Sequence, residues 1–164
     1  MMKWSSEKSL INDVLAQKDK PTKNKGKAAP LVMKTRLILE KDQNILLLRQ
    51  TKHNGGAYTL VGGKVEAGET AKQSLIRESW EESGIILQEE DLSLVHVLHK
   101  VKNGQNRLTL FFSAFYWRGE ITARERHKFK KLEWCNKHRL PESTKPKIKL
   151  VLARIGHGHV YTEV

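Results

Sequence analysis

Five glutamates fall within one short stretch of the sequence, from Gly62 to Gly84. Three of them, Glu78, Glu81 and Glu82, lie within Thr70–Ser83, a run without Pro or Gly that predicts a helix of about four turns. Positions three and four apart place these carboxylates on one side of the helix, where their repulsion costs roughly a few tenths of a kcal/mol per pair. A divalent cation reverses the sign of that energy. Carboxylate oxygens without neighbouring Cys or paired His favour Mg²⁺ or Mn²⁺ over Zn²⁺, and the alternative is a solvated acidic helix face.

A glycine-rich loop, Gly62–Gly68, leads directly into this helix. Glycine permits the backbone to approach a ligand or an ion closely, so the loop favours a binding site over a solvated face. Glu69 stands at the entrance of the helix and Arg77 follows two turns later. This spacing lets the guanidinium of Arg77 hold the carboxylate of Glu69 while it flanks Glu78.

The loop and the helix together resemble the Nudix box, G-x5-E-x7-R-E-U-x-E-E-x-G-U, in which U is a bulky aliphatic residue. The matching residues are Gly63, Glu69, Arg77, Glu78, Glu81, Glu82, Gly84 and Ile85. Ser79 departs at the first U position, which costs some packing beneath the helix and removes no metal ligand. The chain from residue 31 to residue 164 is therefore similar to a Nudix hydrolase domain, and residues 1–30 lie outside the resemblance.

The resemblance implies an α/β/α sandwich around a mixed β-sheet. It also implies a hydrolase that cleaves a nucleoside diphosphate linked to another group, through attack of water at phosphorus with Mg²⁺ or Mn²⁺. Glu69 and Arg77 would form an orienting pair. The metal ligands implied by position are Gly62, through its carbonyl, and Glu78, Glu81 and Glu82.

The catalytic base and the substrate contacts are less closely defined by the resemblance. Glu78 is the first choice for the base, and Glu125 is the second, with a solvated turn residue as the alternative for Glu125. Arg49 matches a position where relatives contact phosphate, with an ordinary strand-end arginine as the alternative. Tyr58 is a candidate for stacking on a base, with core packing as the alternative, and Lys64 is a third candidate for substrate binding. The stretch "YTLVGG" departs from the family's common W-x-L-P-G-G.

The elements that must position these residues are predicted from hydrophobic patterning. Residues 31–40 and 44–50 are strand-like runs around the turn-prone "KDQN", which predicts a β-hairpin. Residues 92–101 and 106–117 predict a second hairpin, because Asn103-Gly104 suits a tight turn. Further elements are a short strand at 130–136 and a helix that begins near Pro146 and ends at Gly156. This mixture predicts an α/β fold whose sheet is not all parallel.

The composition narrows the class of protein and of partner. Lys and Arg outnumber Asp and Glu 30 to 18, so the formal net charge is +12. Such a surface attracts phosphates, although it also serves solubility alone. The single cysteine, Cys135, excludes an intramolecular disulfide framework. No apolar run approaches the ~20 residues of a membrane helix, and the N-terminus lacks the apolar centre of a secretory signal, so we expect a cytoplasmic protein without a membrane span.

The first thirty residues have a separate pattern. Residues 6–17 carry apolar side chains at helical spacing, and the lysine-rich residues 18–30 are typical of a mobile linker. Three functions follow from the whole chain. The first is a MutT-like conversion of a (deoxy)nucleoside triphosphate to monophosphate and pyrophosphate. The second is hydrolysis of ADP-ribose or a dinucleotide, by a monomer or a homodimer. The third, not favoured, is binding of nucleic acid or processing of RNA ends through the basic segment.

Overall fold

The computed structural model describes residues 29–164. The helix predicted at 6–17 and the linker predicted at 18–30 lie outside the described residues, except for the last two positions of the linker. The strands are β1 (Leu31–Lys41), β2 (Asn44–Gln50), β3 (Tyr58–Thr59), β4 (Ser93–Lys102), β5 (Gln105–Ala114), β6 (Phe129–Asn136) and β7 (Tyr161–Glu163). The helices are α2 (Ala71–Ser83) and α3 (Pro146–Gly156), with 3-10 turns at Lys52–Asn54 and Glu89–Asp91.

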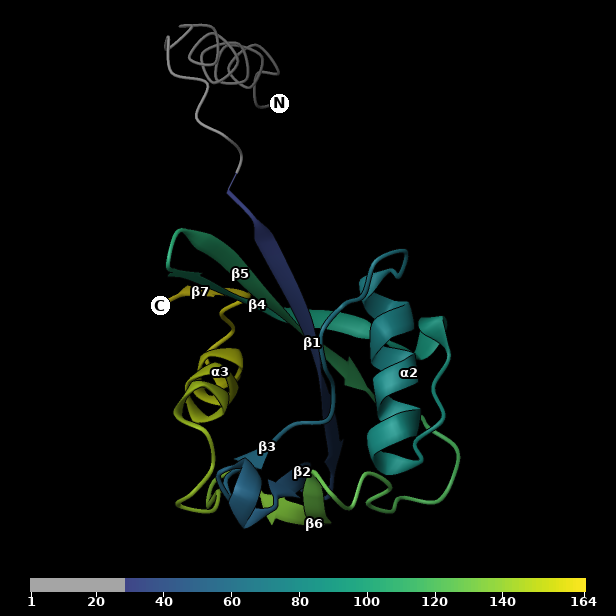
Figure 1. The fold of residues 1–164 in the computed structure, drawn as a ribbon. Coiled ribbons are helices and arrows are strands. Elements are labelled where there is room, and N and C mark those ends of the chain that lie inside the picture. The colour runs from purple at the N-terminus through teal and green to yellow at the C-terminus, as the bar shows by residue number, and fades with distance from the viewer. Residues whose placement is uncertain (1–28) are drawn as a thin grey trace, which may run out of the picture.

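The seven described strands form one mixed sheet with the order β3-β2-β1-β5-β4-β7, and β6 pairs with β2. The strands β1 and β5 run parallel over nine paired residues, and the short β7 lies parallel to β4. The pairs β1–β2, β2–β3, β2–β6 and β4–β5 are antiparallel. Figure 1 shows α2 and α3 on opposite sides of the long strands. The predicted α/β/α sandwich with a mixed sheet is confirmed.

Both predicted hairpins are present, and their turns have the expected backbone conformation. Asp42 and Gln43 connect β1 to β2 with φ angles of 50° and 62°. Asn103 and Gly104 connect β4 to β5 with φ angles of 52° and 70°. Two consecutive positive φ angles match the right-handed twist of the flanking strands, which is why Asn and Gly are favoured there. The hairpins therefore set the register of the strands that follow.

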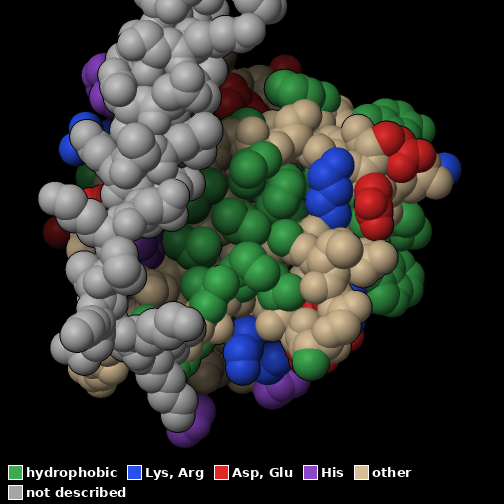
Figure 2. All heavy atoms as spheres, turned by 90° about the horizontal axis from the view of Figure 1, so that it is seen from above, with side chains coloured by type: hydrophobic (Ala, Val, Ile, Leu, Met, Phe, Trp, Pro, Cys, Tyr) green, Lys and Arg blue, Asp and Glu red, His purple; other side chains and the backbone are tan. Residues whose placement is uncertain are grey.

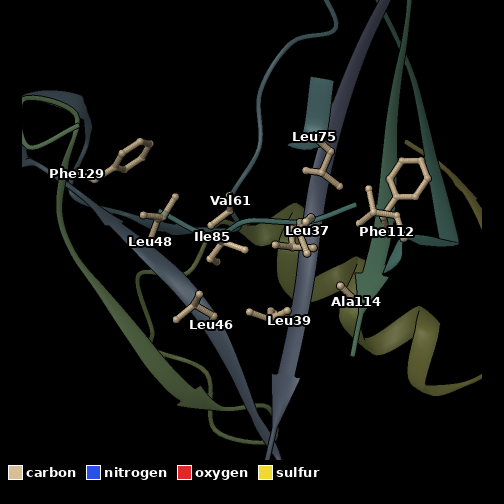
Figure 3. Close-up of a cluster of buried hydrophobic side chains, with 12 residues drawn as sticks. Leu37, Leu39, Leu46, Leu48, Val61, Leu75, Ile85, Phe112, Ala114 and Phe129 are labelled. Carbon is tan, nitrogen blue, oxygen red and sulfur yellow. The ribbon is translucent and has the colours of Figure 1, made fainter. Parts of the chain in front are cut away.

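Two hydrophobic clusters fill the space between the sheet and its helices. Side chains alternate along a strand, so Leu37 and Leu39 of β1 face α2, whereas Ile38 faces α3. Figure 3 shows the first cluster, in which Leu75 of α2 packs near Leu37. Ile148 belongs to the second cluster, on α3. A strand buried on both faces needs a continuous apolar run, which explains the sequences "LIL" and "ILLL".

The two helices have clear start signals. The hydroxyl of Thr70 accepts a hydrogen bond from the backbone of Gln73, whose side chain accepts one from the backbone of Thr70, a reciprocal cap at the start of α2. Pro146 occupies the first turn of α3, as predicted.

No helix in residues 29–164 is long and apolar enough to cross a membrane. Seen from above, hydrophobic side chains gather in the middle of one face, with Lys and Arg near its edges (Figure 2).

Candidate active site

The loop that leads into α2 is fixed along the edge of β1. The backbone N–H of Thr35 donates to the carbonyl of Gly63 at 2.9 Å, and that of Leu37 donates to Val61 at the same distance. Val65 donates in turn to the carbonyl of Met33 at 3.0 Å. These hydrogen bonds continue the ladder of β1 into the loop, so the glycine-rich segment has a defined position relative to the sheet.

The first two glycines of this loop are required for different reasons. Gly62 has a φ angle of 124°, and a Cβ built there would lie 2.4 Å from the carbonyl oxygen of Thr35. A Cβ built on Gly63 would lie 2.0 Å from Oε1 of Glu78. The first contact is with backbone and the second is with a carboxylate that the site is predicted to use. The missing side chain of Gly63 therefore creates the space in which Glu78 rests.

Glu69 and Arg77 form the pair that the sequence predicts. Nε of Arg77 lies 2.6 Å from Oε1 of Glu69, and Nη2 lies 3.1 Å from Oε2, so both oxygens are held by one planar guanidinium. These hydrogen bonds lower the pKa of Glu69 to about 2 and raise that of Arg77. Nη2 of Arg77 also reaches the carbonyl of Lys64 at 3.5 Å. The pair thereby ties the helix to the loop.

The three carboxylates expected on one side of α2 have different surroundings. Nη1 of Arg77 lies 3.2 Å from both Glu78 and Glu81. The Glu81 side chain is 48% exposed, whereas that of Glu78 is 16% exposed. Burial raises the pKa of Glu78, and Arg77 opposes that rise. Glu82 directly follows Glu81 on the helix, and consecutive helix positions differ by about 100° around the axis. The side chain of Glu82 therefore points into the protein, whereas that of Glu81 points towards solvent.

Glu82 is the most buried of these carboxylates, with 5% of the residue exposed. Its Oε2 accepts a hydrogen bond from the backbone N–H of Gly62 at 2.8 Å. Burial raises the pKa of Glu82 to about 7, opposed by this hydrogen bond and by the charge of Arg36. The carbonyl of the same Gly62 accepts a hydrogen bond from Nη1 of Arg36. Glu82 and Gly62 are therefore held together before any ion or substrate binds.

The second candidate for the base, Glu125, lies beside the C-terminal end of α2. The backbone of Arg124 donates to the carbonyl of Glu82 at 3.1 Å, and Thr122 donates to Ser83 at 3.0 Å. Glu125 itself lies 2.7 Å from Nζ of Lys128. In the sequence, Glu125 follows the helix by more than forty residues. In the structure, its segment lies against the C-terminal end of α2. Its role as a base stays a prediction.

The three substrate-binding candidates have unequal access to solvent. Tyr58 is 7% exposed, belongs to the second hydrophobic cluster and donates its hydroxyl to Glu133. Core packing, the alternative for Tyr58, is what the structure shows for this ring. Arg49 lies on β2 with its guanidinium carbon 5.5 Å from the centre of the Tyr58 ring. Lys64 is exposed in the loop, and its backbone bridges to Lys34.

The donor atoms fit a hard divalent cation by their chemistry. Glu78, Glu81, Glu82 and the carbonyl of Gly62 offer only oxygen, which Mg²⁺ and Mn²⁺ prefer. Gly63 leaves room for the carboxylate of Glu78, and Gly62 contacts that of Glu82. Within residues 29–164, however, no three His, Cys, Asp or Glu side chains converge closely enough to hold an ion. Arginine side chains, bonded to Glu78, Glu81 and Gly62, balance the negative charge in this arrangement.

Sequence reasoning missed Arg36 and did not predict the surroundings of Ser79. Arg36 lies within the hydrophobic run of β1, where its side chain has no distinguishing neighbour in the sequence. Ser79 was identified as a departure, and the structure shows the consequence: the residue is fully buried, and its hydroxyl has no hydrogen-bond partner among the described residues. The packing cost at Ser79 is thus accompanied by a polar group left unsatisfied.

Comparisons with known proteins identify a family and several curated relatives. The family model described as "NUDIX domain" matches residues 33–155. The curated relatives include the NAD-capped RNA hydrolase NudC of Edwardsiella ictaluri, which is 31% identical over 106 residues. That match covers 65% of this chain and 39% of the relative. A NudC of Escherichia coli O1:K1 is 37% identical over 85 residues, covering 52% of this chain and 32% of the relative. The chain therefore spans less than half the length of these two curated relatives.

Solved structures agree with the fold. The MutT NUDIX hydrolase from Burkholderia pseudomallei superposes with a TM-score of 0.67 at 25% identity, covering 75% of this chain and 96% of that one. A MutT protein from Bacillus halodurans gives a TM-score of 0.66 at 26% identity, covering 80% and 88%. The family match spans most of the chain and includes the loop, the Arg77–Glu69 pair and the carboxylates of α2. The chain belongs to the Nudix hydrolase family.

Proposed function

We propose that this chain is a metal-dependent hydrolase that cleaves the diphosphate linkage of a dinucleotide of the NAD type. The observation that carries the proposal is the Gly62-Gly63 dipeptide, which contacts Glu82 on one side and leaves room for Glu78 on the other. The NudC relatives support the dinucleotide class, because they are NAD-capped RNA hydrolases. Conversion of a (deoxy)nucleoside triphosphate to monophosphate and pyrophosphate is the second candidate, supported by the MutT structures.

The residues of the chain have separate roles in this proposal. Glu78, Glu81, Glu82 and the carbonyl of Gly62 would hold Mg²⁺ or Mn²⁺. When bound, such an ion neutralises the diphosphate and lowers the pKa of a coordinated water towards neutrality. The Arg77–Glu69 pair would keep the loop in register with α2, because its two parallel hydrogen bonds fix both position and orientation.

The proton of the attacking water would move to a carboxylate. Glu78 is the first choice, because burial raises its pKa and so increases its basicity. The oxygen of water forms a bond to one phosphorus atom, and the bond from that phosphorus to the bridging oxygen breaks. The leaving phosphate departs with that oxygen. Glu125, beside Lys128 at the end of α2, is the alternative acceptor of the proton.

A panel of nucleotides with identification of the products tests this proposal. NAD, ADP-ribose and the (deoxy)nucleoside triphosphates are incubated with Mg²⁺ or Mn²⁺, and the products are identified by mass. Release of two monophosphates from NAD supports the first candidate, whereas release of pyrophosphate from a triphosphate supports the second. Glu82→Gln should lose most turnover and keep the fold, while Glu90→Gln, an exposed glutamate outside the site, should change neither. Full turnover in excess chelator would contradict the metal dependence.

A further inference from the structure

A second concave site lies on the α3 side of the sheet, where positive side chains collect. The cavity has a volume of about 240 Å³, and no Asp or Glu side chain lines it. Val164, at the end of the chain, forms part of its edge. The charged residues that line it are Lys34, Lys100, Lys102, Arg107 and Lys147. Four elements, β1, β4, β5 and α3, therefore contribute cations to one small space.

The register of the sheet explains how these residues meet. Val32 of β1 pairs with Arg107 of β5, which pairs with Lys100 of β4. Residues directly opposite one another on paired strands point to the same face. Lys34 follows on the next row of the same face, opposite Thr109. The cations are therefore placed by backbone pairing, and their convergence does not depend on the conformation of a loop.

These cations have no acidic partner among the described residues. None of the five forms an ion pair within residues 29–164, although Lys128, Lys131 and Lys137 each pair with a glutamate. Nη2 of Arg107 donates to Gln105 at 3.0 Å, but its buried Nε has no partner in the described part of the chain. Unpaired cations so close together raise the energy of the empty cavity and attract an anion.

The pKa values of the lysines reflect the same crowding. Partial burial, together with the charges of Arg36, Lys34, Lys145 and Lys100, lowers the pKa of Lys147 to about 8. An anion in the cavity would reverse that effect of the neighbouring charges. The positions of these side chains and their positive charges therefore both favour an anion in the cavity.

The cavity and one residue of the candidate active site lie on the same face of β1. Arg36, which bonds the carbonyl of Gly62, points to the same face as Lys34 because the two residues are two positions apart. Each such step covers about 7 Å, so Lys34 lies one step from Arg36 and the row of Val32 and Arg107 lies two steps away. The cavity shares no lining residue with the Gly62–Gly68 loop or with α2, to which the proposed function assigns the diphosphate. An anion in the cavity therefore contacts a different set of residues from the diphosphate that is hydrolysed.

We propose that this cavity binds a phosphate group of the substrate other than the diphosphate that is hydrolysed. The inference rests on the proposed function, since it assigns an additional contact to the same substrate. The phosphate is ester-linked to a ribose, and two sources have that chemistry: the 2′-phosphate of a dinucleotide, and the first 3′-phosphodiester of a capped RNA. The cations of β4 and β5 select for this group, whereas the residues of the Gly62–Gly68 loop and of α2 act on the diphosphate.

Kinetics with three matched substrates test the assignment. NAD lacks the additional phosphate, NADP carries it at the 2′ position, and an NAD-capped RNA tetranucleotide carries it at the 3′ position. We expect KM for at least one extended substrate to be about tenfold lower than for NAD, as for a charge-assisted hydrogen bond. Lys100→Ala and Arg107→Gln should abolish that difference and leave KM for NAD unchanged. Lys41→Ala removes the same charge at the far end of β1 and should preserve the difference.

The outcome separates this inference from the proposed function. Equal KM values for the three substrates in the unaltered chain would overturn it, and so would variants that weaken NAD as much as the extended substrates. If the chain hydrolyses none of the three, the dinucleotide proposal fails, and calorimetry in chelator then decides on the cavity. Adenosine 3′,5′-bisphosphate and adenosine 2′,5′-bisphosphate are the probes, with AMP as the control. Tighter binding of either bisphosphate, lost in Lys100→Ala, supports the assignment, and binding equal to that of AMP overturns it.

Discussion

Replacing Gly63 by alanine should separate the activity of this protein from its stability. The added Cβ would lie 2.0 Å from Oε1, 2.2 Å from Cδ and 2.6 Å from Oε2 of Glu78, whereas ordinary contacts begin at 3.4 Å. Glu78 must therefore move its carboxylate by more than about 1 Å. Since this group is the end of a flexible side chain, it can rotate away without displacing the backbone.

The two consequences have different magnitudes. A shift of the Glu78 rotamer costs about 0.5–1.5 kcal/mol, and the alanine offsets part of that cost by reducing the entropy of the unfolded chain. The free energy of unfolding should thus change by no more than about 1 kcal/mol. A reacting group that is misplaced by about 1 Å can lower turnover by about a hundredfold. Gly63→Ala should therefore remain folded and lose most of its activity.

Gly62→Ala provides the matched control. Its Cβ would meet the backbone oxygen of Thr35 at 2.4 Å, and its φ angle of 124° is unfavourable for any side chain. This variant should lose about 2–3 kcal/mol of unfolding free energy or more, since neither the strand nor the loop can rotate away. Urea denaturation and turnover are measured on the same preparations. Unchanged turnover in Gly63→Ala would refute a catalytic or ligand role for Glu78 at its present position.

Three further predictions concern the helix that carries the carboxylates. Arg77→Lys should change stability by no more than about 1 kcal/mol yet lower turnover by about tenfold or more, because lysine cannot hold both oxygens of Glu69; wild-type turnover would show that the pair does not position the loop. Ser79→Ala should raise the free energy of unfolding by about 1 kcal/mol in urea, because it removes a buried hydroxyl without a partner; a destabilised variant would mean that the hydroxyl is satisfied in solution. The lowered pKa of Glu69 means that its stabilising contribution is present above about 4.5 and is lost as the pH falls towards 2, so Glu69→Gln should flatten the stability profile in that window, and an unchanged profile would argue against the ion pair.

The sequence predicted the parts of the site that depend on local geometry. A helix repeats every 3.6 residues, so the positions of Arg77 and Glu78 on the helix and of Glu69 just before it were enough to predict the ion pair. The same local argument grouped Glu81 with Glu82, and the structure separates them. Their positions differ by about 100°, and only packing against β1 and the loop determines which of the two turns inward. Burial and its effect on the pKa of Glu82 are therefore tertiary properties.

The shortest strands could not be predicted from the local sequence, because they form only by pairing with other strands of the sheet. The strand β7 has only three residues, and it exists because Val97, Leu98 and His99 of β4 offer it a free edge. The strand β3, at the other end of the sheet order, is shorter still and pairs with only two residues of β2. Neither segment has the length or alternation that predicts a strand by itself. Short strands of this kind follow from the sheet they join.

The basic cavity shows why the pairing register matters for function. Lys34 and Arg107 are separated by 73 positions, and they meet only because β1 runs parallel to β5 with Val32 opposite Arg107. A shift of that register by one residue would place Lys34 on the opposite face of the sheet from Arg107 and Lys100. The catalytic motif lies on a loop and a helix, so it would survive such a change more easily. If the proposed phosphate contact is present, the sheet selects between substrates that share a diphosphate. Variants confined to the residues of α2 would then change turnover without changing which extended substrate binds best.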